Sequence, residues 1–236
     1  MTSPTIVFIT GVGRGIGRQL VETYLARPNT TVIGSVRDKA SATGQTLSEI
    51  PTATGSKLFV LSLEVSEPKA ALTAVKEIQA AGIDHLDIVI ANAGITGPPG
   101  FASIDVVTAE ALTECFKVNT LGPIFLFQAT KSLLEKSKDP KWVVVSTYIS
   151  SIGLLGTNGM HVAPAYGISK AGLNWATVSV HATHKWLTAI SLHPGLVQTD
   201  MGNAAAKSFG MAEAPTSKQA SADAIIAVRQ DRRFDA

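Results

Sequence analysis

Short runs of β-branched and aliphatic residues alternate along the chain with longer segments whose apolar residues recur at helical spacing. Several short runs, such as 7–9 and 142–145, are apolar at every position, which is typical of strands covered on both faces. Strand–helix alternation with right-handed crossovers folds into a doubly wound parallel sheet. The pattern therefore predicts an α/β protein with helices on both faces of one parallel sheet.

The predicted strands lie at 5–10, 30–36, 57–65, 86–92, 141–146 and 187–194, and the predicted helices at 15–26, 69–81, 108–135 and 165–183. No repeat, low-complexity tract or linker divides the 236 residues, so we expect residues 1–236 to form one domain. Apolar residues make up 45% of the chain and charged residues 16%, which is enough for a sizeable core.

Charge and cysteine content narrow the expected environment of the protein. The net charge is +2 and no basic run reaches five residues, which argues against nucleic-acid binding. The single cysteine, Cys115, fits a reducing compartment. The first residues contain only the short apolar run 6–9, and no stretch has the length of a membrane span. We therefore expect a cytoplasmic protein that binds neither nucleic acid nor membrane.

Glycines dominate the segment TGVGRGIG (10–17), which follows the first predicted strand. It matches G-x-x-x-G-x-G rather than G-x-G-x-x-G, and the Gly-Lys-Ser/Thr of a P-loop does not follow. Glycines permit close backbone approach, and a helix N-terminus offers free N–H groups and positive potential to a pyrophosphate. An ordinary tight turn would not require four glycines, so the segment predicts phosphate binding.

The end of the second strand distinguishes the two nicotinamide cofactors, because an acidic residue there bonds the ribose 2′-hydroxyl and a basic one accommodates a 2′-phosphate. Arg37 follows this strand directly and Arg14 lies inside the glycine loop. Two cations directed at the expected position of the 2′-phosphate favour NADP(H) over NAD(H). Asp38 would instead bond the ribose if the strand ended one residue later.

Further polar signatures follow the later strands. Tyr166 and Lys170 are spaced i, i+4 on a predicted helix, where an ammonium lowers the pKa of a neighbouring phenol and makes it a better acid–base catalyst. Such a pair alone is weak evidence, because it also occurs by chance. ANAG (91–94) and HPGLVQTD (193–200), however, follow two other strands. Asn119 precedes Pro123 within a long helical pattern, which predicts a kink near the asparagine.

Together TGVGRGIG, ANAG, Asn119, YGISK and HPGLVQT resemble the short-chain dehydrogenase/reductase family over about residues 5–205. IDHLDIVIANAG, AYGISKAGLNW and VQTDMGN are similar to fungal ketoreductases of the norsolorinic acid ketoreductase type. The resemblance implies a Rossmann-like fold and NADP(H)-dependent reduction of an apolar, aromatic or polyketide-like ketone. It also implies a homodimer or homotetramer. The alternative is a catalytically silent NADP(H)-binding redox sensor or scaffold protein.

The resemblance also implies roles for individual residues. Tyr166 would protonate the carbonyl oxygen, Lys170 would bind the nicotinamide ribose, and Asn119 would support a water-linked proton relay, with no metal involved. Glu64 stands where the family usually has aspartate beside the adenine. The residues expected to contact the cofactor are Gly11, Arg14, Gly15, Ile16, Gly17, Arg37, Glu64, Val65, Asn92, Ala93, Gly94, Tyr166, Lys170, Val197 and Thr199.

A serine hydroxyl of the segment STYISSIG (146–153) would hold the substrate oxygen. Ser150 is favoured, because the family's serine typically lies three residues before a glycine and a loop's length before the tyrosine, and Ser150 is three before Gly153 and sixteen before Tyr166. Ser151 is second, since a one-residue slip of the loop would exchange the two serines. Thr147 is third, because its hydroxyl directly follows the strand if the strand ends at Ser146.

Two segments depart from the family's pattern. Residues 224–236 contain no convincing β-run where the family places a seventh strand, so that strand is expected to be missing or replaced. Residues 200–218 are rich in alanine, glycine and serine, with few anchoring side chains, where the family has a substrate-covering lid. We predict mobility in that lid.

Overall fold

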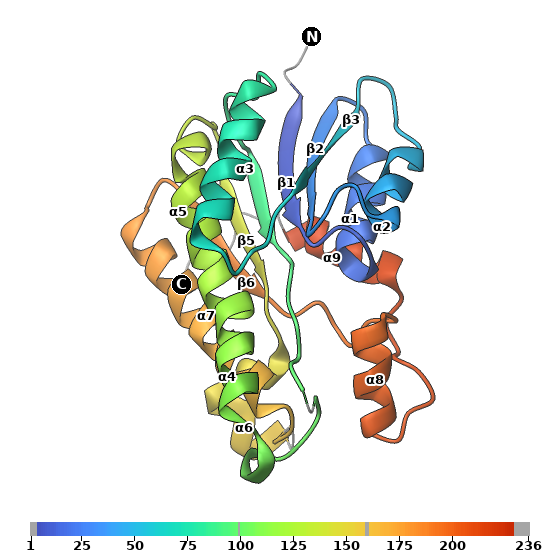
Figure 1. The fold of residues 1–236 in the computed structure, drawn as a ribbon, viewed down its shortest axis with the longest axis vertical. Coiled ribbons are helices and arrows are strands. Elements are labelled where there is room, and N and C mark those ends of the chain that lie inside the picture. Colours follow the sequence, from blue (N-terminus) through green and yellow to red (C-terminus); the bar gives the residue numbers. More distant parts are fainter. Residues whose placement is uncertain (1–3, 99, 159–160, 229–236) are drawn as a thin grey trace.

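The computed structural model describes residues 4–98, 100–158 and 161–228. Its single sheet has six parallel strands in the order β3-β2-β1-β4-β5-β6 (Figure 1). The strands are β1 (Thr5–Thr10), β2 (Thr30–Val36), β3 (Lys57–Ser62), β4 (Ile88–Ala91), β5 (Lys141–Val145) and β6 (Thr188–Leu192). The predicted doubly wound sheet is confirmed. Strand order reverses between β1 and β4, the kind of switch point at which such sheets bind ligands.

Four strands are shorter than the sequence predicted: β3, β4 and β6 by three residues each, and β5 by one. The ladder of β3 with β2 ends at the pair Val36 and Ser62, so the apolar residues up to 65 continue beyond the sheet. Strand β4 begins at Ile88 rather than at 86. In both cases an apolar run exceeds the hydrogen-bonded strand, because apolar side chains also line the space beyond the strand ends.

The predicted helix 108–135 is interrupted in its middle. It consists of α4 (Ala109–Phe116), a π-helical turn (Lys117–Leu121) and α5 (Gly122–Leu134). Pro123 lies at the start of α5 and lacks the N–H that would continue the regular ladder. The irregularity predicted near Asn119 is therefore present as a π-helical turn, a feature frequent at functional sites.

The other long helices are α1 (Gly15–Leu25), α3 (Pro68–Ala80), α7 (Pro164–Thr183) and α9 (Lys218–Val228). The shorter ones are α2 (Ala42–Gln45), α6 (Ile152–Asn158) and α8 (Asp200–Ser208), with 3₁₀ turns at Thr46–Glu49, Ile104–Val106 and Tyr148–Ser150. Short helices escape sequence prediction because one or two turns give little periodicity. None of the helices in the described part of the chain is both long and apolar enough to span a lipid bilayer.

Helices cover both faces of the sheet and bury two apolar cores. One core joins α3, α5 and α7 to strand residues such as Phe8 and Trp142. The other joins α1 and α9 to strand residues such as Val7 and Ile9. Figure 1 shows α1 and α9 on one side of the strands and α3, α5 and α7 on the other. Burying each such side chain contributes about 1.5–3 kcal/mol, so the two cores hold the strand ends rigidly in place.

The segments after β6 are better anchored than the sequence suggested. The expectation of few anchors at 200–218 is wrong, because Ala205, Ala206 and Ala214 are buried and Asn203 Oδ1 accepts the N–H of Ala214 at 3.0 Å. Mobility of this lid stays a prediction. The segment predicted as irregular from 224 continues α9, and no strand follows β6 up to Val228; residues 229–236 lie outside the described residues.

Candidate active site

A cleft of about 1190 Å³ lies beyond the carboxyl ends of the strands. Segments that follow each of the six strands contribute to its wall, as the switch-point rule requires. Pockets for one small ligand typically measure 300–1,000 Å³. The cleft is therefore large enough for a dinucleotide together with a second small molecule.

The glycine loop after β1 forms one wall of this cleft. Gly11 (φ 72°) and Gly15 (φ 59°) adopt the left-handed conformation that favours glycine. A Cβ at Gly17 would lie 2.3 Å from the carbonyl oxygen of Gly11 and 2.6 Å from Asn92 Nδ2. The structure therefore places Gly17 behind the loop, outside the described cleft lining, where it lets α1 pack closely; its predicted cofactor contact stays a prediction.

The start of α1 has the features that an anion requires. Arg14 precedes the helix in extended conformation and makes no side-chain cap, so the N–H groups of the first turn lack a side-chain acceptor. Ser35 Oγ, at the end of β2, is buried, lines the cleft and has no hydrogen-bond partner among the described residues. A loop of bare backbone, free N–H groups and an unsatisfied hydroxyl fit the pyrophosphate and ribose of a dinucleotide.

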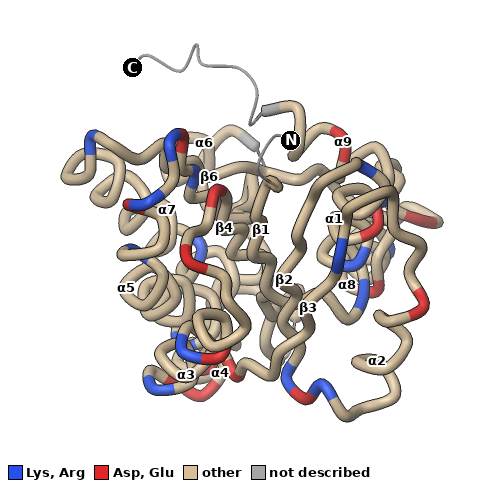
Figure 2. The backbone as a smooth tube through the Cα atoms, turned by 90° about the horizontal axis from the view of Figure 1, so that it is seen from above, with Lys and Arg blue, Asp and Glu red and all other residues tan. Residues whose placement is uncertain are grey.

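The charged residues of the cleft wall differ in their hydrogen-bond and ion-pair partners. Asp38 Oδ1 accepts the N–H of Ala40 at 2.9 Å, so its carboxylate closes a turn. Arg37 is exposed on the cleft wall, where Figure 2 shows a blue–red–blue run of charged residues leading from β2 toward α2. Arg14 Nη1 donates to Asp200 Oδ2 at 2.7 Å, and both side chains are exposed. Of the two predicted phosphate ligands, Arg37 is therefore the one without a carboxylate partner in the described structure.

Other predicted cofactor contacts line the cleft with their polar groups partly engaged. Glu64 Oε1 accepts from the Ser66 hydroxyl at 2.9 Å, and Thr199 Oγ1 accepts the N–H of Gly202 at 3.0 Å. Asn92 Nδ2 donates to the carbonyl oxygen of Thr10 at 2.8 Å. Ile16, Val65, Ala93, Gly94 and Val197 also line the cleft.

Asn119 lies in the π-helical turn and is fully buried, behind the cleft wall. Its Nδ2 donates to the carbonyl oxygen of Ile95 at 2.8 Å, and its Oδ1 accepts the N–H of the same residue at 2.9 Å. A Cβ at Gly94 would lie 3.0 Å from Asn119 Oδ1 and 3.5 Å from Lys170 Nζ. The asparagine therefore fixes the loop after β4 next to the lysine.

Tyr166 and Lys170 lie together on the cleft wall, in the first turns of α7. Lys170 Nζ is 5.8 Å from the centre of the Tyr166 ring and donates to the carbonyl oxygen of Val145 at 2.7 Å. Burial raises the pKa of Tyr166 to about 12 and lowers the pKa of Lys170 to about 8. The lowering of the tyrosine pKa expected from Lys170 is not found in the protein alone, because desolvation of the phenolate dominates.

The structure separates the three candidate hydroxyls. Thr147 directly follows Ser146 at the end of β5 and lines the cleft, and its side chain acts to lower the pKa of the Tyr166 phenol. Ser150 is buried, and its Oγ donates to the carbonyl oxygen of Thr147 at 2.6 Å and accepts from Asn174 Nδ2 at 2.8 Å. Neither Ser150 nor Ser151 is among the described residues that line the cleft.

The structure places Thr147, the third choice from the sequence, on the cleft wall, and the choice of Ser150 as the catalytic hydroxyl stays a prediction. The position directly after the strand, rather than the spacing to a glycine, is the signal that favours Thr147. Residues of the cleft wall that the sequence did not single out for the site include Ser35, Ser41, Thr43, Tyr148, Ile149 and His193.

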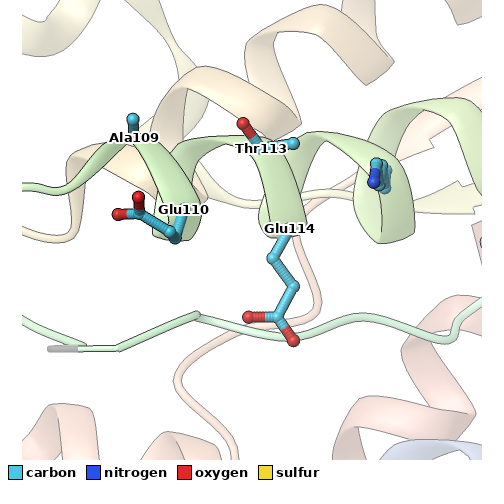
Figure 3. A pocket seen from close by; sticks show the side chains of 5 residues that line it. Ala109, Glu110, Thr113 and Glu114 are labelled. Atoms are coloured by element: carbon cyan, nitrogen blue, oxygen red, sulfur yellow. The ribbon is translucent and has the colours of Figure 1, made fainter.

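A second hollow, of about 370 Å³, lies along one face of α4. Figure 3 shows Glu110 and Glu114 extending from this helix away from its axis. The hollow is lined by Ala109, Glu110, Thr113, Glu114 and Lys117. None of these is a member of the Tyr166–Lys170 set, so the candidate chemistry belongs to the large cleft.

Known proteins are similar to this chain in sequence and in fold. A family model described as short chain dehydrogenase matches residues 5–208. The short-chain dehydrogenase srdF of Neurospora crassa is 44% identical, over 96% of this chain and 89% of that protein. Norsolorinic acid ketoreductase nor1 of Dothistroma septosporum is 39% identical, over 94% of this chain and 83% of that protein. The crystal structure of NADPH-bound carbonyl reductase from chicken fatty liver superposes with a TM-score of 0.80 at 27% identity, covering 94% and 86% of the two chains.

Proposed function

Since the chain belongs to the short chain dehydrogenase family of oxidoreductases, we propose that it is an NADP(H)-dependent carbonyl reductase. Its substrate would be an apolar ketone of aromatic or polyketide-like structure, and the reverse reaction would oxidise the corresponding alcohol. One observation carries the proposal: Tyr166, Lys170 and Thr147 meet on the wall of a cleft that also contains the glycine loop and Arg37.

The protonation states of the site suit reduction. When bound, NADP(H) supplies the hydride. A pKa of about 12 keeps the phenol of Tyr166 protonated at neutral pH, the state in which it can give its proton to a carbonyl oxygen. Thr147, whose side chain interacts with that phenol, would hold the same oxygen. The buried Lys170, with a pKa of about 8, is a cation at neutral pH and stabilises the phenolate that remains.

Hydrogen bonds from Asn119 and Lys170 keep these groups in place. Asn119 bonds both backbone groups of Ile95 and so positions the loop beside Lys170. We assign to it the support of a proton relay from the lysine, through water, to solvent. Lys170 in turn bonds Val145 at the end of β5, which ties the helix that carries Tyr166 to the strand that precedes Thr147.

Two observations support NADP(H) rather than NAD(H). Arg37 is exposed at the cleft wall, whereas the carboxylate of Asp38 is held by Ala40 in a turn. A guanidinium binds phosphate oxygens through paired, charge-assisted hydrogen bonds. The chicken liver carbonyl reductase, a structural neighbour, carries NADPH.

The proposed substrate class is supported by the apolar side chains of the cleft, and the proposed oligomeric state by an exposed apolar face of α7. Phe101, Ile149 and Leu196 line the cleft, which suits an apolar ketone, and the Dothistroma relative is named for reduction of norsolorinic acid.

On α7, Trp175 and Val178 expose 75% and 66% of their surface. We propose that this face forms the contact of a homodimer or homotetramer, and that the single-domain protein is cytoplasmic.

The proposal is tested by adding NADPH to the purified protein with a panel of aromatic ketones and following NADPH absorbance. We expect oxidation of NADPH that depends on the ketone, with aliphatic ketones of similar polarity as the matched control. Calorimetric binding of NADPH without turnover of any ketone would contradict the proposal and favour a silent redox sensor or scaffold.

A further inference from the structure

The ladder between β5 and β6 continues past the last paired residues of the sheet. Val145 pairs with Leu192, and the N–H of Ser146 donates to the carbonyl oxygen of Leu192 at 2.7 Å. In a parallel ladder alternate residues donate, so the next N–H in line belongs to Tyr148. That N–H donates instead to a side chain, His193 Nδ1, at 3.2 Å. The imidazole thus replaces a backbone carbonyl as the next acceptor.

These two hydrogen bonds lie on either side of Thr147, the residue that carries the hydroxyl beside Tyr166. Thr147 itself is extended (φ −157°, ψ 154°), and the 3₁₀ turn Tyr148–Ser150 follows it directly. Among the described residues, Ser146 and Tyr148 make the hydrogen bonds that tie this segment to β6 and the residue after it, while Ser150 ties the turn to Asn174 of α7. The acceptor that His193 provides therefore contributes to the orientation of the Thr147 hydroxyl.

His193 can accept this hydrogen bond only when its Nδ1 carries no proton. An imidazole that accepts at Nδ1 carries its proton on Nε2, and a doubly protonated ring has no acceptor. Burial lowers the pKa of His193, which favours the neutral ring. The ring of Tyr148 also packs near the imidazole, with centroids 6.1 Å apart, and both residues line the cleft.

We propose that His193 is a positioning residue for the reaction: its neutral imidazole accepts the N–H of Tyr148 and so holds the turn after β5 with the Thr147 hydroxyl facing Tyr166. This inference rests on the proposed function, because it gives Thr147 the substrate oxygen. It assigns no proton transfer to His193.

The first test compares two substitutions of nearly equal size. His193→Asn keeps an acceptor where Nδ1 stands, and His193→Leu removes it. Misplacing a reacting group by about 1 Å can slow a reaction by roughly 100-fold. We therefore expect His193→Leu to lower kcat by roughly 10- to 100-fold with the KM for NADPH unchanged, and His193→Asn to stay within about threefold of wild type. Equal losses of kcat in both variants, or none in either, would overturn the proposal.

A double-mutant cycle shows whether His193 acts through Thr147. If it does, His193→Leu causes no further loss of kcat in a Thr147→Val background. Independent, multiplying losses would mean that the imidazole contacts substrate directly and would overturn the proposal.

Hydrogen exchange provides a readout that does not need turnover. The amide of Tyr148 should exchange at least tenfold faster in His193→Leu than in wild type, and at near wild-type rate in His193→Asn. Unchanged exchange in both would overturn the inference even if the enzyme is active. Absence of turnover by wild-type protein, with the exchange pattern as expected, would instead contradict the proposed function alone.

Discussion

Replacing Thr147 and Ser150 one at a time should separate catalysis from stability. Ser150 Oγ donates to the carbonyl oxygen of Thr147 at 2.6 Å and accepts from Asn174 Nδ2 at 2.8 Å, in a buried setting. Alanine at 150 leaves buried polar groups unsatisfied, which costs about 1–3 kcal/mol. Thr147→Val is nearly isosteric and removes the weak 3.4 Å contact from the N–H of Ile149 and the interaction with the Tyr166 phenol, so its stability should change by less than about 1 kcal/mol.

The effects on turnover should be reversed. Removing one preformed donor to the reacting oxygen lowers kcat by roughly 10²–10³-fold in other enzymes. We expect a loss of that size for Thr147→Val and near wild-type kcat for Ser150→Ala. Ser151→Ala is the matched control and should leave both properties unchanged.

The assays are urea unfolding, for the free energy, and NADPH oxidation with an aromatic ketone at saturating concentrations, for kcat. The opposite pattern, with kcat lost in Ser150→Ala and retained in Thr147→Val, would refute the assignment and restore the choice based on spacing.

Three further results are expected. Arg37→Asp should raise the Kd for NADPH by roughly 10–100-fold, the equivalent of about 1.5–3 kcal/mol for charged hydrogen bonds, and leave the Kd for NADH within about threefold; equal changes would remove Arg37 from the 2′-phosphate. Gly17→Ala should destabilise by about 1–3 kcal/mol in thermal unfolding, because its Cβ would lie 2.3 Å from the Gly11 oxygen, whereas Gly153→Ala, with open space around it, should be neutral. The folded-state pKa of Lys170, about 8, lies below its ordinary value of 10.5, so the unfolded chain binds more protons between these values and the free energy of unfolding should rise with pH from about 8 to 10. Lys170→Met should lack this rise, and an unchanged slope would contradict the burial of a charged lysine.

Much of the fold could be predicted from the sequence, because apolar runs and helical periodicity report burial directly. The strands 5–10 and 30–36 are found at the predicted bounds, and α1 and α7 differ by a residue at one end. The π-helical turn at Lys117–Leu121 was predictable as an irregularity from Pro123, although not in its type. Helix α8 was not predictable, since its anchors are alanines whose burial depends on the rest of the fold.

The sequence predicts site residues well when they lie one helical turn apart on the same helix. It predicts them less well when their position depends on the conformation of a turn. Tyr166 and Lys170 are one helical turn apart, and the structure brings them together as expected. The choice among the hydroxyls at 146–153 depends on where the chain leaves the sheet, which no local pattern reveals. His193 had no recognisable signal, because its partner is a backbone N–H 45 residues away.

The central claim is that Tyr166 donates the proton in a carbonyl reduction, and Tyr166→Phe tests it most directly. The phenyl ring fills the same space without the hydroxyl, so the Kd for NADPH should stay within about twofold. Loss of a general acid lowers rates by about 10²–10⁴-fold. Turnover of an aromatic ketone by Tyr166→Phe should fall by that amount in single-turnover experiments with bound NADPH. Turnover within about threefold of wild type would contradict the account.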